Sequence, residues 1–294
     1  MYAYPIGLIP SRVIDAAVAD ALRLELDGYT SAYVEYSVGG WATAPLWVNP
    51  GDRPGEEVRE NDEPAQPIAS VRDMDGLNDL ISTYFDVSFL RSARLFRACN
   101  GAIILPHRDY LEHKHGFTRM HVPLITDVIQ ARNSEDSSCF HMRRGEVWYL
   151  EARRIHSGGV TGSAKRVHLV LDFSHKIGPG ETIVSKLEPP REPLLVQRPD
   201  LPPDFLPSYQ ALAPFINAAA WRELFHILAR VHLRYNVDAA EVYEWLAKIA
   251  AESGEDRDLL VRDADRMKRY YLSDGPAATP TFDAMWVNSG TRDG

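Results

Sequence analysis

Cysteine is scarce in this sequence, since its 294 residues include only Cys99 and Cys139. So few cysteines exclude a disulfide scaffold and a cysteine-rich metal site, and we expect two reduced thiols in a cytoplasmic protein. Residues 1–10 lack the basic and long apolar stretches of a signal peptide. No apolar run approaches the roughly 18 residues that a membrane helix requires.

A surplus of positive charge is also missing, because 32 Lys and Arg stand against 41 Asp and Glu, a net charge of −9. Phosphate binding requires a basic face, so we expect neither nucleic acid nor an anionic membrane surface as a partner. The 20 prolines and 19 glycines form no low-complexity tract. The composition is that of an ordinary globular protein, and the chain is long enough for one large domain or two smaller ones.

The first 185 residues or so have the pattern of a β-rich region. Short runs of Val, Ile, Leu and aromatic residues alternate with turn-forming residues, which is typical of strands. The expected strands lie at 102–105, 120–125, 146–150 and 166–173. Apolar residues at helical spacing predict two helices in this region, over 14–26 and 76–85.

The last third of the chain is different. Residues 189–207 hold seven prolines, which predicts a linker or a surface wrap. Beyond it, apolar stripes beginning at Trp221, Val242 and Leu260 predict packed helices. We therefore expect a mainly β fold with some α: a sandwich or jelly roll that encloses a site, and a C-terminal helical domain. The expected divisions are 1–188, 189–207 and 208–287.

The most informative motif follows an apolar strand that ends at Pro106. His107 and Asp109 come next, and residues two apart in an extended chain point the same way, so both side chains can ligate one ion. His156 is the candidate third ligand; it precedes Ser157-Gly158-Gly159, which we expect to form a turn. Two imidazoles and one carboxylate form the facial triad of Fe(II) oxygenases. Zinc is the rival metal, but the helical HExxH motif is absent, and a chance pair explains His-x-Asp taken alone.

Two further strands alternate between polar and apolar residues. Arg166 and His168 share one face, and a buried Arg there requires a carboxylate partner, such as that of a ligand. The alternative is a surface Arg on an edge strand. Arg119 and His121 repeat the pattern, with the outward face of a half-exposed strand as the alternative.

Five motifs follow one another in order: His107-Arg108-Asp109, Arg119-Met120-His121, 141–150, His156-Ser157 and Arg166-Val167-His168. Together they resemble the aspartyl/asparaginyl β-hydroxylase family of 2-oxoglutarate oxygenases, and within it the bacterial cis-proline hydroxylases that act on the free amino acid. Parts of the tail between 221 and 246 resemble the same subgroup. The fold expected is thus a double-stranded β-helix, the jelly-roll or cupin core, with a helical C-terminal domain.

The resemblance also implies roles for the residues already singled out. His107, Asp109 and His156 would bind Fe(II), and Arg166 would pair with the distal carboxylate of 2-oxoglutarate. Arg119 and His121 would lie near the other end of this cosubstrate. The implied reaction consumes O2 and couples C–H hydroxylation to oxidative decarboxylation of 2-oxoglutarate to succinate and CO2.

Substrate residues are predicted on the same basis. Arg97 matches an Arg of the proline hydroxylases and would hold the amino-acid carboxylate; a salt bridge to an acidic residue is the alternative. Tyr36 and Trp41 would line the pocket. The remaining candidates are given structural or solvent-exposed roles: Trp148 in the core, His141 as a structural histidine, and His113 and His115 in a solvated loop.

The function expected is hydroxylation of a free L-amino acid, with proline, pipecolate or a related amino acid as the small-molecule substrate. A hydroxylase of Asp or Asn residues in peptides is an alternative, and it would require an open groove. A non-catalytic jelly-roll sensor of small molecules is the alternative from another class.

Overall fold

The computed structural model describes residues 1–24, 34–50, 63–109, 117–174, 182–254 and 256–273. The strands in these ranges are β1 (Tyr4–Leu8), β2 (Ser37–Val48), β3 (Gln66–Pro67), β4 (Leu90–His107), β5 (Phe117–Ile125), β6 (Ala131–Glu135), β7 (Ser138–His141), β8 (Glu146–Leu150), β9 (His156–Val160), β10 (Lys165–Ser174) and β11 (Leu194–Leu195). The α-helices are α1 (Ser11–Arg23), α2 (Asp75–Tyr84), α3 (Phe205–Leu212), α4 (Ala218–Leu228), α5 (Glu241–Glu252) and α6 (Arg257–Leu272). Short 3-10 helices lie at Val34–Tyr36, Ala69–Val71, Val87–Phe89, Ala213–Phe215 and Val231–Leu233.

The predicted elements are present. The four expected strands are confirmed as parts of β4, β5, β8 and β10, and the two expected N-terminal helices are α1 and α2. Helix α1 begins at Ser11, three residues before the predicted start, directly after Pro10. The three apolar stripes of the C-terminal region lie on α4, α5 and α6 and are buried.

The strands form one curled antiparallel sheet, in which β2 and β4 are the longest members. Strand β4 pairs first with β10 and then, near its end, with β9. Between these two stretches Asn100 and Gly101 have positive φ angles of 52° and 73°, and Gly39 on the adjacent β2 has a φ of 80°. This left-handed backbone suits Asn and Gly. The resulting bend places His107 opposite His156 across the β4–β9 pair.

The glycines after His156 have a different role from the one predicted. Residues 157–159 lie inside strand β9 and not in a turn, so the expected turn is wrong. A Cβ atom at Gly159 would lie 2.3 Å from the carbonyl oxygen of Ala102, so only glycine allows β9 to approach β4 this closely. These glycines therefore allow close packing of two strands.

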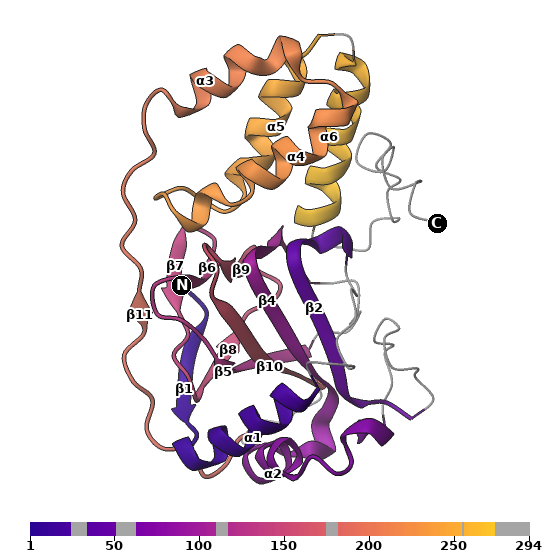
Figure 1. Ribbon diagram of the computed structural model, residues 1–294, viewed down its shortest axis with the longest axis vertical. Helices are drawn as coiled ribbons and strands as arrows, with labels where there is room; N and C mark the ends of the chain where they lie inside the picture. The colour runs from indigo at the N-terminus through magenta and orange to yellow at the C-terminus, as the bar shows by residue number, and fades with distance from the viewer. Residues whose placement is uncertain (25–33, 51–62, 110–116, 175–181, 255, 274–294) are drawn as a thin grey trace.

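The two faces of the sheet have different partners. One face is apolar and packs on α1 and α2, with residues of β5 and β10 such as Val122, Leu124, Leu169 and Leu171 in the shared cluster. Figure 1 shows α1 and α2 together at one end of the sheet. The other face is polar and yet buried, and it carries Arg119, His121, Arg166, His168 and Asp172.

The helical region lies at the opposite end of the sheet (Figure 1). The proline-rich segment is extended and runs along one side of the molecule, with β11 paired to β7. Helices α4 to α6 share an apolar cluster with Tyr36, Val38, Ile103 and Leu105 of the β-rich region. Helix α3 begins at Phe205, inside the segment predicted as a linker. The expected domain boundaries remain a prediction.

The expected fold class is confirmed: a mainly β, jelly-roll core with helices gathered in the C-terminal region. None of the helices in the described ranges has the length and apolar character needed to cross a membrane.

Candidate metal centre

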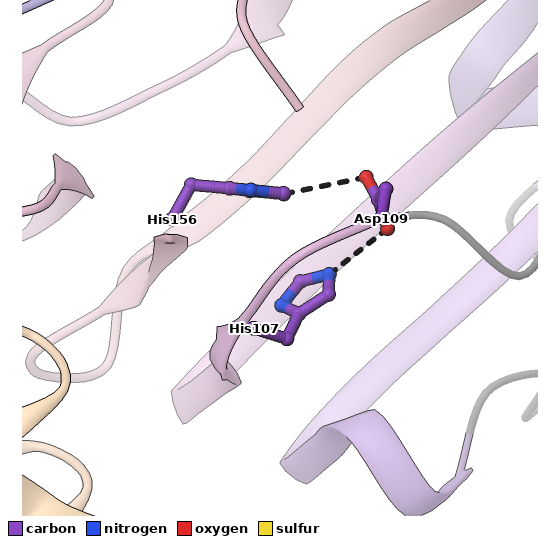
Figure 2. Close-up of side chains that lie close together, drawn as sticks. All are labelled: His107, Asp109 and His156. Atoms are coloured by element: carbon purple, nitrogen blue, oxygen red, sulfur yellow. Dashed lines mark hydrogen bonds and ion pairs between the residues drawn. The ribbon is translucent and has the colours of Figure 1, made fainter. Parts of the chain in front are cut away.

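Three side chains converge at the C-terminal end of β4, beyond the bend at Asn100 and Gly101. Figure 2 shows the rings of His107 and His156 directed at the carboxylate of Asp109, each toward a different oxygen. Nε2 of His107 lies 3.1 Å from one Asp109 carboxylate oxygen, and Nε2 of His156 lies 3.4 Å from the other. The two imidazole rings are 4.4 Å apart, and both histidines are buried. One ligand atom from each residue falls within 4.8 Å of the others.

Hydrogen bonds to the backbone set the tautomer of both imidazoles. Nδ1 of His107 lies 2.7 Å from the carbonyl oxygen of Leu105, and Nδ1 of His156 lies 3.0 Å from that of Arg154. A carbonyl only accepts, so each Nδ1 carries a proton and each Nε2 is the atom left to bind a metal ion. In the neutral imidazole that binds metal, the Nε2 lone pair would repel the carboxylate unless a cation lies between them. The separations of 3.1 and 3.4 Å between the Nε2 atoms and the carboxylate oxygens are short enough for one ion to be bound by all three side chains.

The charge states also suit a metal. Burial lowers the pKa of His107, and the neighbouring His156 lowers it further. Burial alone would raise the pKa of Asp109, but the charge of Arg119 and the proximity of His107 outweigh it and hold this pKa well below its usual range. Neutral imidazoles and an ionised carboxylate are the forms that bind metal ions.

A buried aspartate organises the arginines beside this group. Arg119 donates to Asp109 and also to Asp172, with its Nε 2.7 Å from Oδ1 of Asp172. Arg94 donates to the other oxygen of Asp172 over 2.8 Å. Asp172 is fully buried, so the alternative of an outward polar face for Arg119 is wrong. The sequence analysis missed Asp172 and Arg94, although Asp172 shares the alternating face of Arg166.

Arg166 lies deeper along the same polar face. Its Nη2 donates to Oδ1 of Asn133 over 2.7 Å and to Nδ1 of His168 over 3.2 Å. Strand β10 lies between β5 and β4, so the alternative of a surface arginine on an edge strand is wrong. Burial lowers the pKa of Arg166 to about 9.

His121 lies near both Arg166 and His156. Its ring lies 5.7 Å from that of His168. Burial, followed by the charges of Arg166 and Arg119, holds the pKa of His121 well below its usual value. Within the described part of the chain, both ring nitrogens of His121, Nε2 of His168 and Nε of Arg166 are buried without hydrogen-bond partners. Such atoms cost roughly 1–3 kcal/mol each, so they mark a place for a polar ligand, and the arginines favour an anion.

Two of the three predicted substrate residues lie on this side of the sheet. The ring of Tyr36 is 5.0 Å from that of His107. Trp41 is opposite Ala98, which is itself opposite Arg166, and its ring packs against Phe96 at 5.7 Å.

The structure does not bring Arg97 to the site. Arg97 is opposite Val167, and Val167 belongs to the apolar cluster on the other face of the sheet. Successive side chains on a strand alternate between faces, so Arg97 points away from Arg166. The arginine of β4 on the polar face is Arg94, which the register places opposite Val170 and which binds Asp172.

The remaining candidates agree with their predicted structural roles. Trp148 is fully buried, stacks on Phe140 at 5.1 Å and donates to Glu146. His141 is buried with its Nδ1 3.0 Å from the carbonyl of Ala131. His113 and His115 lie outside the described residues.

Comparison with known proteins identifies two matching regions. Residues 25–176 match the family described as Aspartyl/Asparaginyl beta-hydroxylase. The chain belongs to this family. Residues 183–276 match the family described as L-proline 3-hydroxylase, C-terminal. The resemblance proposed from the motifs is therefore confirmed.

The chain is similar to an L-proline cis-4-hydroxylase of Rhizobium meliloti (strain 1021), with 31% identity over 86% of this chain and 90% of the relative. It is also similar to an L-proline cis-3-hydroxylase of Streptomyces sp., with 30% identity over 76% of this chain and 80% of the relative. A solved 2OG-Fe(II) oxygenase from Burkholderia pseudomallei has a TM-score of 0.40 and 14% identity over 57% of this chain and 84% of its own, too distant to inform the reaction. The family and its named hydroxylases make this chain an oxygenase enzyme.

Metal binding tests the converging side chains directly. We expect the protein, freed of metal, to bind one Co(II) ion as a stand-in for Fe(II). Replacing His107→Ala should weaken this binding by more than the roughly 10–100-fold that loss of an outer partner costs. A titration followed by visible absorption measures the affinity, and circular dichroism checks the fold.

The matched control is His226→Gln in α4, a buried histidine far along the chain from the three side chains. It should leave Co(II) affinity unchanged. Equal affinity in the wild type and in His107→Ala would contradict the assignment.

Proposed function

We propose that this enzyme is an Fe(II)/2-oxoglutarate-dependent hydroxylase of a free L-amino acid, with proline, pipecolate or a related amino acid as substrate. The observation that carries the proposal is the set of two imidazoles and one carboxylate, from His107, His156 and Asp109, beside the polar face that holds Arg166. The similarity to named L-proline hydroxylases supports the class of substrate.

In this proposal His107, Asp109 and His156 would hold Fe(II), and three protein ligands would leave the metal accessible to 2-oxoglutarate and O2. The bound metal supplies the oxidation chemistry that couples C–H hydroxylation to decarboxylation of 2-oxoglutarate to succinate and CO2. The protein's part is to keep the His107 imidazole neutral, to keep the Asp109 carboxylate ionised and to exclude water. Burial lowers the pKa of His107, and burial of both histidines limits the access of water.

Arg166 is the proposed partner of the distal carboxylate of 2-oxoglutarate. A buried guanidinium pairs with a carboxylate in a bidentate fork. Asn133 and His168 hold one of its nitrogens and so fix its orientation. Arg119 donates to Asp109, and His121 is close enough to Arg166, Arg119 and His156 for their charges to affect its pKa, so the opposite end of the cosubstrate would lie near these two residues.

For the amino-acid substrate we propose Arg94 as the carboxylate partner in place of Arg97, because Arg94 lies on the polar face. Tyr36 and Trp41 would line the pocket. A buried aromatic group beside His107, formed by Tyr36 and two tyrosines of α6, supports a small substrate over a peptide.

A product screen tests the proposed reaction. The protein would be incubated with Fe(II), 2-oxoglutarate, ascorbate and each standard amino acid or pipecolate. We expect one or a few of these to gain one oxygen atom by mass spectrometry, with matching release of succinate. Omitting Fe(II) or 2-oxoglutarate should abolish both signals.

The same screen contains Asp- and Asn-containing peptides as competing substrates. Oxidation of peptides without oxidation of any free amino acid would refute the proposed substrate class. Absence of succinate release with all substrates would refute the coupled reaction.

Three arginine variants test the assigned carboxylate partners by their separate effects on two KM values. Loss of a hydrogen bond to a charged group costs about 1.5–3 kcal/mol, or about 10–100-fold in KM. Arg166→Ala should raise KM for 2-oxoglutarate by this factor, and Arg94→Ala should raise KM for the amino acid.

Arg97→Ala is the matched control, because Arg97 is on the same strand as Arg94 but on the opposite face. It should change neither KM. The assignments are wrong if Arg97→Ala raises KM for the amino acid while Arg94→Ala does not, or if Arg166→Ala leaves KM for 2-oxoglutarate unchanged.

A further inference from the structure

Residues of the C-terminal helices form hydrogen bonds with the backbone that carries His107 and Asp109. The hydroxyl of Tyr243, on α5, donates to the carbonyl of Pro106 over 2.5 Å. The carbonyl of Tyr271, on α6, accepts a hydrogen bond from the backbone N–H of Arg108 over 2.9 Å. The two helices thus contact the residue before His107 and the residue between the two ligands.

Aromatic packing connects these contacts to the His107 ring itself. The ring of Tyr36 lies 5.0 Å from that of His107 and 5.4 Å, edge-on, from that of Tyr271. The hydroxyl of Tyr271 donates to the carbonyl of Glu35. Because Tyr271 also stacks on Tyr243 at 5.7 Å, α5 and α6 meet the ligand-bearing segment as one unit.

These groups are buried, so their hydrogen bonds are not exchanged for water. Tyr243 and Tyr271 have no exposed surface. Burial raises the pKa of both hydroxyls well above the usual value, so both remain donors at any physiological pH. Loss of the Tyr243 hydroxyl would remove this buried hydrogen bond from the Pro106 carbonyl.

The β-rich region holds the same segment from the other side. Asp109 N–H donates to the carbonyl of Ala152 over 2.8 Å, and His107 is paired with His156 across β9. The segment 106–109 therefore lies between two independent supports, one from the sheet and one from the helices. Both supports therefore hold the backbone that carries the His107 imidazole and the Asp109 carboxylate.

We propose that α5 and α6 position the metal ligands, with Tyr243 as the positioning residue that fixes the backbone next to His107 through its hydroxyl. This inference rests on the proposed function of His107, Asp109 and His156 as metal ligands. It gives the helical region a task in metal binding. Outer partners of this kind orient the ligands and contribute to metal affinity.

The test is Tyr243→Phe, which keeps the ring and its stacking on Tyr271 but removes the hydroxyl. We expect the affinity for Co(II) to fall about 10-fold or more, and the visible spectrum of the Co(II)-saturated protein to change because the ligand geometry relaxes. A role in fold stability alone would lower the unfolding temperature without changing either metal readout.

Ser253→Ala is the matched control. It also removes a buried hydroxyl's hydrogen bond to a backbone carbonyl, the 2.7 Å bond to Ala250, but just after the end of α5 and not at the segment 106–109. It should leave Co(II) affinity and spectrum unchanged. Equal affinity and spectrum in Tyr243→Phe and the wild type would overturn the inference. If His107→Ala also failed to weaken binding, the metal assignment itself would fail, so the two failures are distinguishable.

Hydrogen exchange of the wild-type protein decides the question if Tyr243→Phe does not fold. Coupling is reciprocal, so metal binding should stabilise the helices that support the ligands. Addition of Co(II) should slow exchange in peptides that cover Tyr243 and the end of α6, compared with peptides from α1 and α2. Equal exchange in the helical peptides with and without Co(II) would overturn the inference.

Discussion

The constraint on which the structure depends is the burial of an ionised carboxylate beside two imidazoles. Asp109 keeps its charge because Arg119 binds it, and burial lowers the pKa of His107. Hydrogen bonds to backbone carbonyls place a proton on Nδ1 of both histidines, so both Nε2 atoms face the carboxylate. Acceptor atoms at this spacing repel one another without a cation among them. The arrangement thus costs stability on its own and is explained by a metal ion.

The fold supplies this arrangement through one bend and one register. The positive φ angles at Asn100 and Gly101 turn β4 from β10 to β9, which sets its two ligands against His156. The register of β4, β5 and β10 then gathers the buried arginines on the same face, with Asp172 between two of them. The described side chains that bind Arg166, Asn133 and His168, include no carboxylate. Arg166 can therefore pair with the carboxylate of a ligand.

Much of this was predictable from local pattern. The spacing of His107 and Asp109 on a strand end, and the alternation around Arg166, depend only on neighbouring residues, and both describe the structure correctly. Arg97 was assigned from the family resemblance, and the face on which it lies depends on strand register, which a single strand does not reveal. Gly158 and Gly159 were misread because close strand packing and a turn both require glycine. The contact of Tyr243 with Pro106 joins residues 137 apart in sequence and carries no local signal.

The most direct test of this account is an anaerobic crystal structure with Fe(II) and 2-oxoglutarate, using anomalous diffraction at the iron absorption edge. The account predicts one iron within about 2.2 Å of Nε2 of both histidines and of an Asp109 oxygen. It also predicts that the far carboxylate of 2-oxoglutarate pairs with Arg166. Iron bound elsewhere in an intact fold, with these three side chains free of metal, would contradict it.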